Sequence, residues 1–174
     1  MSEAARGSQA AFLALIERHE RALHRFFRLS GRDAHEADDG AQETFLRLYA
    51  FRRRFNARGH GGFRALLYRI ARNVLADGLR KKRRAPSCRP LDDALGLPTR
   101  AGAGALADDA IDLAWALRSL PDKLRSVVVL GVFQGLAYRE VAEALRIPVG
   151  TVKSRMYFAV QRLREVLHAE LRSP

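Results

Sequence analysis

Apolar residues recur every three or four positions along most of the chain, which is the spacing of one buried face of an α-helix. In the first half this spacing predicts three helices. We expect Ser8 to cap the first, which ends near Ser30–Gly31. Asp33 is expected to cap the second, and the third begins at Phe63, after a glycine-rich loop over 56–62. No stretch alternates apolar and polar residues as a half-buried strand does, so the pattern predicts an all-α protein.

The predicted third helix has two unlike faces. Its apolar side consists of Phe63, Leu66, Leu67, Ile70, Val74 and Leu79. Its polar side consists of Arg69, Arg72, Asn73, Asp77 and Arg80. We expect the first set to be buried and the second to face solvent or a partner.

The helical pattern resumes near 108, with one helix through Trp115 and another that has Pro121 in its first turn. Two short amphipathic helices follow, over 138–145 and from Pro148 onward. The apolar stripe of the latter consists of Val152, Met156, Ala159, Leu163 and Val166. This pair predicts a helix-turn-helix, in which the second helix lies in the DNA major groove. A plain helical hairpin with a solvated polar face fits the same pattern.

Residues 85–107 show no sustained helical period and hold three of the six prolines in the chain. We interpret them as a flexible linker. The chain is therefore predicted to form two small helical domains, with three or four helices in residues 1–84 and a helix-turn-helix in 108–174.

The net charge of +12 is concentrated in one segment. Between Arg47 and Arg84 the chain has 13 Lys or Arg and a single acid, Asp77, while the remainder is neutral. A surface built only for solubility mixes both signs of charge. The segment therefore indicates a polyanionic partner, because each neutralised phosphate releases counterions and favours binding.

Several classes of protein are disfavoured by the sequence. The longest apolar runs, such as 127–133, are far shorter than a membrane-spanning helix, and no secretory signal is evident at the N-terminus. The single cysteine, Cys88, forms no internal disulfide, and the five histidines do not cluster. We therefore expect a cytoplasmic protein without a metal, a cofactor or a catalytic site.

The arrangement of these motifs resembles the extracytoplasmic-function sigma factors, the small bacterial initiation subunits of RNA polymerase. The stretches "ADDGAQETFLRLY" and "FRALLYRIARNVLADGLRKKRR" resemble the two main helices of the sigma-two domain. The stretch "LPDKLRSVVVLGVFQGLAYREVAEALRIPVGTVKSRM" is similar to sigma-four almost position by position. The resemblance implies core RNA polymerase, promoter DNA and an anti-sigma factor as partners.

The resemblance also implies roles for particular residues. One acidic pattern, made up of Asp38, Asp39, Gln42 and Glu43, would dock on the clamp coiled coil of the polymerase. The flap of the polymerase would be a further contact. The basic third helix and the loop before it would hold the minus-ten element through His60, Gly61, Tyr68, Arg69, Arg72, Asn73, Asp77 and Arg80. The second helix of the helix-turn-helix would bind the minus-thirty-five element through Thr151, Lys153, Ser154, Arg155, Tyr157 and Phe158.

Five positions depart from the family pattern. Leu66 stands where a tryptophan is usual, and Phe158 where an arginine is common on the recognition helix. Gly40 replaces a large aliphatic residue, at a cost of about 1 kcal/mol in helix propensity. Ala137 lacks the side chain of a helix cap, and Arg146 replaces the glycine of the turn, where we expect a left-handed backbone.

Two other functions fit parts of the sequence. A free-standing helix-turn-helix regulator would explain the second half, but it normally requires a dimerisation element. An RNA-binding protein would explain the basic helix alone. Only the sigma-factor interpretation uses both halves and the acidic helix.

Overall fold

The computed structural model describes residues 1–55, 62–84 and 115–170. The first part of the chain forms α1 (Ser2–Ala5), α2 (Gln9–Leu29), α3 (Ala34–Phe51), the short 3-10 helix η1 (Arg52–Arg54) and α4 (Phe63–Arg84). The second part forms α6 (Asp122–Val128), the π-helical turn η3 (Val129–Phe133), α7 (Tyr138–Leu145) and α8 (Val149–Glu170). No strand occurs within these ranges, and the predicted all-α class is confirmed. The predicted linker at 85–107 and the loop at 56–61 lie outside them.

Both predicted caps in the first half are present. The side chain of Ser8 accepts a hydrogen bond of 3.2 Å from the backbone N–H of Ala11 at the start of α2. Asp33 accepts one of 2.8 Å from the N–H of Glu36, whose own side chain accepts from the N–H of Asp33. This reciprocal pair satisfies two backbone donors that the first turn of α3 leaves without helical partners.

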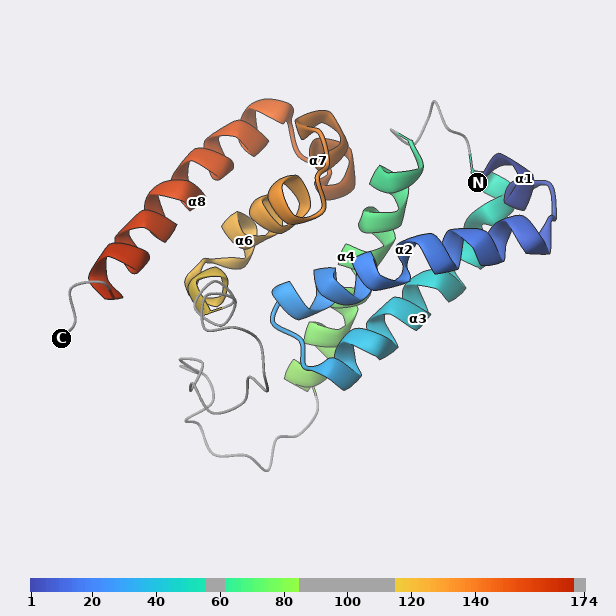
Figure 1. Ribbon diagram of the computed structural model, residues 1–174, viewed down its shortest axis with the longest axis horizontal. Coiled ribbons are helices and arrows are strands. Elements are labelled where there is room, and N and C mark those ends of the chain that lie inside the picture. Colours follow the sequence, from blue (N-terminus) through green and yellow to red (C-terminus); the bar gives the residue numbers. More distant parts are fainter. Residues whose placement is uncertain (56–61, 85–114, 171–174) are drawn as a thin grey trace.

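The helices α2, α3 and α4 pack together around a common core (Figure 1). Its fully buried side chains include Leu23, Phe27, Leu48, Leu66 and Leu67. The prediction for the apolar side of α4 is wrong at Leu79, which is 39% exposed. This residue borders a cavity that it shares with residues of α6 and α8, and the cavity leaves its side chain partly solvated.

The second core lies between α6, η3, α7 and α8. The stripe predicted for α8 is buried at Val152, Met156 and Ala159, which pack with Val141 of α7 and Leu130 of η3 in the apolar core. Figure 1 shows α8 as a long helix at the edge of this group. Because its first turns are anchored on only one face, the opposite face is left open.

The two groups of helices are in contact with each other. Helix α4 packs against α7, and α2 packs against η3 (Figure 1). The sequence predicted two helical domains but gave no indication that they would dock. This contact decides which of the predicted functional residues are accessible.

Candidate nucleic-acid and polymerase interface

The predicted recognition helix α8 presents its polar first turns to solvent. Lys153, Ser154, Tyr157 and Phe158 are exposed, and Thr151 is half-buried. The rings of Tyr157 and Phe158 meet edge to face with centroids 5.6 Å apart. The start of α8 thus offers an amine, two hydroxyl groups and an aromatic pair on one surface, a combination able to contact both base edges and phosphates.

The turn before α8 sets the direction of that surface. Arg146 has a left-handed backbone with φ 54°, as expected from the missing glycine. Ala137 provides no side-chain cap for α7, but its N–H donates to Oε2 of Glu140 at 2.9 Å. The helix-turn-helix geometry therefore persists although neither usual residue is present.

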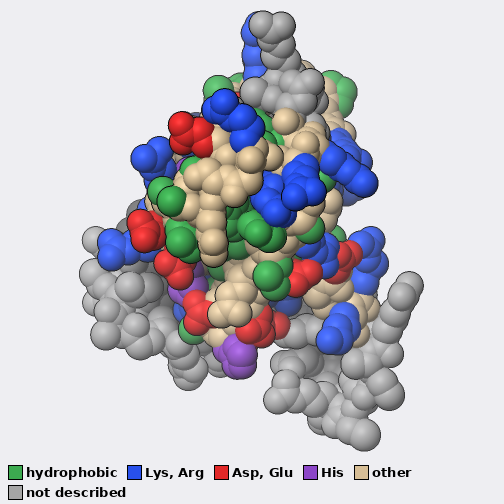
Figure 2. Space-filling model, turned by 90° about the vertical axis from the view of Figure 1, so that its right-hand side faces the viewer, with side chains coloured by type: hydrophobic (Ala, Val, Ile, Leu, Met, Phe, Trp, Pro, Cys, Tyr) green, Lys and Arg blue, Asp and Glu red, His purple; other side chains and the backbone are tan. Residues whose placement is uncertain are grey.

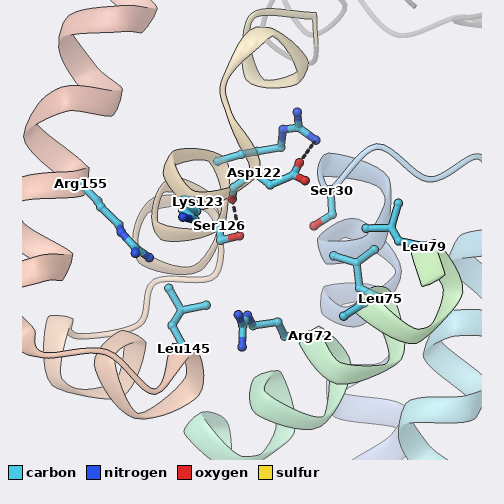
Figure 3. Close-up of a pocket in the computed structure, with 11 residues that line it drawn as sticks. Ser30, Arg72, Leu75, Leu79, Asp122, Lys123, Ser126, Leu145 and Arg155 are labelled. Atoms are coloured by element: carbon cyan, nitrogen blue, oxygen red, sulfur yellow. Dashed lines mark hydrogen bonds and ion pairs between the residues drawn. The ribbon is translucent and has the colours of Figure 1, made fainter. Parts of the chain in front are cut away.

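Arg155 differs from the other predicted contacts on α8. It is half-buried and lines a cavity of about 210 Å³ together with Arg72, Leu75 and Leu79 of α4 and Lys123 of α6 (Figure 3). Residues predicted to contact two different promoter elements thus face the same cavity.

The predicted minus-ten residues on α4 divide into exposed and covered sets. Arg72, Asn73 and Arg80 are exposed, and Arg69 and Asp77 are half-buried. Tyr68 is only 2% exposed, and its hydroxyl donates a 2.7 Å hydrogen bond to Oε1 of Gln134. Its ring also meets that of Phe26, with centroids 5.6 Å apart. In this arrangement no base is able to stack on Tyr68.

Burial raises the pKa of the Tyr68 hydroxyl to about 12, against the lowering effect of Arg64 and Arg25. The phenol is therefore a neutral hydrogen-bond donor at physiological pH. His60 and Gly61, the other residues predicted for this site, lie outside the described residues.

Asp77 is held in an ion-pair network. Nη1 of Arg47 on α3 lies 2.7 Å from Oδ2 of Asp77, Arg80 pairs with Oδ1, and Nε of Arg47 lies 2.7 Å from Glu43. The hydrogen bonds from Arg47 and Arg80 lower the pKa of Asp77. Each member is partly solvated, so each pair stabilises the fold by less than about 1 kcal/mol. The network connects α3 to α4. Both oxygens of the Asp77 carboxylate are engaged in it.

The acidic residues predicted for polymerase binding are accessible along α3. Asp38 lies 3.3 Å from Nε2 of His24, and Asp39 lies 3.5 Å from Nδ1 of His35. A backbone hydrogen bond, and then the charge of Asp39, raise the pKa of His35. Asp39 and Glu43 also line a cavity of about 610 Å³ between α3 and α4, and Gln42 is exposed. Asp38, Asp39 and Gln42 are thus exposed, whereas Glu43 is half-buried and paired with Arg47.

Basic side chains are distributed more widely than the acidic ones. Figure 2 shows a face of the first helical group on which Lys and Arg lie at several places around exposed hydrophobic side chains. On the same face, acidic side chains gather with a histidine toward the lower part (Figure 2). A polyanion and a basic partner are therefore offered different parts of the surface.

Sequence reasoning missed three residues at the contact between the two helical groups. Arg25 donates to the carbonyl of Phe133 at 2.7 Å, and Arg64 donates to the carbonyl of Gln134. Gln134 itself is buried and accepts from Tyr68. No periodic signal marks them, since each is a polar residue whose partner lies in the other half of the chain.

The described residues include no cluster that suits a metal ion and no helix that suits a membrane. Among these residues, no three His, Cys, Asp or Glu side chains gather in a way that would hold a metal ion. None of the described helices combines the length and the apolar character that a membrane crossing requires.

Both halves match known protein families. Residues 15–85 match the model of Sigma-70 region 2, and residues 112–163 match that of Sigma-70, region 4. The chain is 35% identical over 167 residues to the ECF RNA polymerase sigma factor SigM of Mycobacterium tuberculosis, covering 92% of this chain and 79% of SigM. It is also 35% identical over 182 residues to SigW of Bacillus subtilis, covering 96% and 92%.

Solved structures show the same fold over both halves. The structure of CnrH in complex with the cytosolic domain of CnrY is similar with a TM-score of 0.74 and 28% identity, covering 96% of this chain and 94% of that one. The sigma factor RpoE in complex with the anti-sigma factor NepR from Bartonella quintana has a TM-score of 0.74 and 26% identity, covering 91% and 97%. With both family regions matched in order and relatives covering nearly its whole length, the chain belongs to the ECF RNA polymerase sigma factors.

Proposed function

We propose that this chain binds core RNA polymerase and directs it to a specific set of promoters. The observation that carries the proposal is the pairing of an exposed acidic helix with an exposed recognition helix in one chain that matches both sigma regions. One surface serves the polymerase and the other serves DNA, so the chain acts as an adapter and contributes no catalytic group of its own.

The recognition surface on α8 reads the minus-thirty-five element. Lys153 and Tyr157 lie one turn apart on the exposed face and reach base edges, with Ser154 between them. Thr151, at the helix start, binds a phosphate where free N–H groups and the helix dipole favour an anion. Arg155 contributes a flanking phosphate contact, and Phe158 replaces a charged contact with an apolar one.

The acidic surface of α3 binds the clamp coiled coil. Its carboxylates at Asp38 and Asp39 are exposed, and their present partners are histidines that a basic residue of the polymerase displaces readily. Gln42 and Glu43 extend the same surface by one helical turn. The second domain reaches the flap of the polymerase.

The basic face of α4 follows the minus-ten strands. Arg69, Arg72 and Arg80 supply positive charge along a single-stranded groove, and Asn73 offers a base contact. His60 and Gly61 hold a flipped base. Tyr68 supports α4 from within the core, where its ring packs on Phe26, and it does not stack on a base. Such a protein works in the cytoplasm, where RNA polymerase is found. Its expected regulator is an anti-sigma factor.

Run-off transcription with core polymerase on genomic fragments tests the proposal. Transcripts should appear only when this protein and core polymerase are both present. A variant with Asp38→Lys and Asp39→Lys should lose about tenfold in core affinity, or about 1.4 kcal/mol, while keeping its fold. Glu17→Lys with Glu20→Lys, at two exposed acids on α2, is the matched charge control. Specific operator binding without polymerase, and no polymerase-dependent transcripts, would instead identify a free-standing regulator.

The same assay, run on a randomised minus-thirty-five library, tests the assignment of α8. Lys153→Ala and Tyr157→Ala should each change which sequences are tolerated, since a lost base contact removes about 1–3 kcal/mol of discrimination. Arg162→Ala, farther along α8 where its side chain pairs with Glu165, is the control and should keep the parental preferences. Parental preferences in the Lys153 and Tyr157 variants would place the reading surface elsewhere.

A further inference from the structure

The cavity between α4, α6 and α8 is surrounded by positive charge. Arg72 of α4, Lys123 of α6 and Arg155 of α8 line it. None of the three has an ion-pair or hydrogen-bond partner among the residues that the structure describes. They come from helices far apart in the sequence and converge on one hollow (Figure 3). Like charges that face one space repel each other, so an anion between them would be stabilised by all three.

The carboxylate that lines the same cavity is already paired. It belongs to Asp122, whose Oδ1 lies 3.3 Å from Nη1 of Arg125. The other nitrogens of Arg125 donate to backbone carbonyls, with 2.8 Å from Nε to the carbonyl of Leu117 and from Nη2 to that of Leu120. Asp122 and Arg125 thus neutralise each other, and the three other cations remain available to a ligand.

The walls between these charges are largely apolar. Leu75 and Leu79 of α4 and Leu145 of α7 line the cavity together with the cations. Apolar walls have a low dielectric constant and concentrate the field of the charges in the cleft that they border. The three cations therefore attract an anion more strongly here than they would on a flat, fully solvated surface.

The size and geometry of the cavity indicate which anion it suits. Its volume of about 210 Å³ is several times the roughly 30 Å³ that one water molecule takes in the liquid, so it admits a polyatomic group. Figure 3 shows Arg72 and Arg155 approaching from opposite walls. A guanidinium group binds a phosphate group through two parallel N–H donors, whereas the ammonium of Lys123 acts as a point charge. Two guanidinium groups on opposite walls suit two linked phosphate groups.

We propose that Arg72, Lys123 and Arg155 form a binding site for a diphosphate group, carried either by free pyrophosphate or by a nucleotide. The site goes beyond the proposed function, in which Lys123 has no part and the ligands are DNA and polymerase. A DNA backbone presents its phosphates in a row along the outside of a duplex, whereas these three cations converge on one cavity. A small diphosphate matches that convergence.

Isothermal titration of the full chain with inorganic pyrophosphate, in about 0.15 M salt, tests the site. Saturable binding with one site per chain is expected. ADP, titrated in the same way, distinguishes the two sources of the diphosphate, because it binds only if the cavity also accepts the attached nucleoside. An absence of saturable pyrophosphate binding up to about 1 mM would overturn the proposal.

Three single substitutions locate the site. Arg72→Ala, Lys123→Ala and Arg155→Ala should each weaken pyrophosphate binding about tenfold, because each removes a charge-assisted contact. Arg139→Ala is the matched control, at an exposed arginine of α7 that does not line the cavity, and should leave the affinity unchanged. An equal loss in all four variants would show that the net charge of +12 attracts the anion without a site.

A substitution that keeps every charge separates the cavity from general electrostatics. Ala76→Leu adds volume to the cavity wall on α4 and should also weaken pyrophosphate binding. Ala50→Leu, at an exposed alanine of α3, is its control and should bind like the unmodified chain. Equal affinities of these two variants would place the anion outside the cavity and overturn the proposal. The titrations contain neither polymerase nor DNA, so their failure would leave the outcome of the transcription assay unchanged.

Discussion

Gly40 shows that the residue type required at one position of a helix can depend on a side chain far away in the sequence. A Cβ built at Gly40 would lie 2.8 Å from Cε1 of Phe27, a ring that is 1% exposed in the core between α2 and α3. The sequence indicates only that glycine is unfavourable inside a helix. The packing of the Phe27 ring makes glycine necessary at position 40, because α2 and α3 approach closely at this point.

Gly40→Ala should therefore lower the stability of the protein. The gain in helix propensity is about 1 kcal/mol, whereas overpacking in a closed core costs about 1–3 kcal/mol. Thermal unfolding measures the difference as a decrease in Tm.

The control is Gly78→Ala in α4, where a Cβ meets nothing within 4 Å. That variant should raise the Tm, since only the propensity term remains. A Tm for Gly40→Ala above that of the unmodified protein would show that the Phe27 ring moves aside.

At the scale of the element, the helix-turn-helix combines a strained backbone in its turn with exposed side chains at the start of α8. Arg146 takes a left-handed backbone between α7 and α8, and a non-glycine residue in that region is strained by about 1–2 kcal/mol. The strained turn aims the start of α8, so that Lys153 and Tyr157 face outward. Local strain at Arg146 thus accompanies the outward orientation of the surface that we propose binds DNA.

Arg146→Gly should stabilise the protein by about 1 kcal/mol by removing that strain, although the glycine also gains freedom in the unfolded state. Chemical denaturation gives the change in the free energy of unfolding. Arg146→Ala keeps the strain and should give no such gain. Equal effects of the two substitutions would show that the side chain of Arg146, not its backbone, determines the stability.

At the scale of the whole molecule, the two groups of helices are in contact although both carry a net positive charge. Residues 1–84 hold 19 Lys or Arg against nine Asp or Glu, and residues 115–166 hold nine against four. Their mutual repulsion opposes this docked arrangement, while the buried hydrogen bond between Tyr68 and Gln134 favours it. The balance is therefore sensitive to ionic strength.

Raising the salt concentration from about 0.05 M to 0.5 M should increase the fraction of molecules in which the two helical groups are docked. Energy transfer between one dye on each group, at Ala34→Cys and Arg118→Cys in a Cys88→Ser background, measures that fraction. Salt screens repulsion over the Debye length, about 10 Å at 0.1 M, but it weakens buried hydrogen bonds little. A decrease in transfer with salt would show instead that exposed ion pairs hold the halves together.

Much of this protein is predictable from local sequence. The caps at Ser8 and Asp33 and the buried part of the α8 stripe follow from residue type and spacing, because each depends on neighbours within a few positions. The left-handed Arg146 was implied by the resemblance to the family, which has a glycine in that turn. The exposure of Lys153 and Tyr157 follows from the same periodicity. So does the all-α class, whereas the sigma-factor family was indicated by the resemblance of the motifs in both halves.

Tertiary structure alone decided which of these residues are accessible. Tyr68 is covered and Arg155 turns into a cavity because two domains dock, whereas Leu79 lines the same cavity and stays 39% exposed. Gln134, Arg25 and Arg64 carry no periodic signal, since their partners lie at least 66 residues away along the chain. Sequence periodicity fixes the faces of a helix, but the contact between two folded domains depends on surfaces that exist only after each has formed.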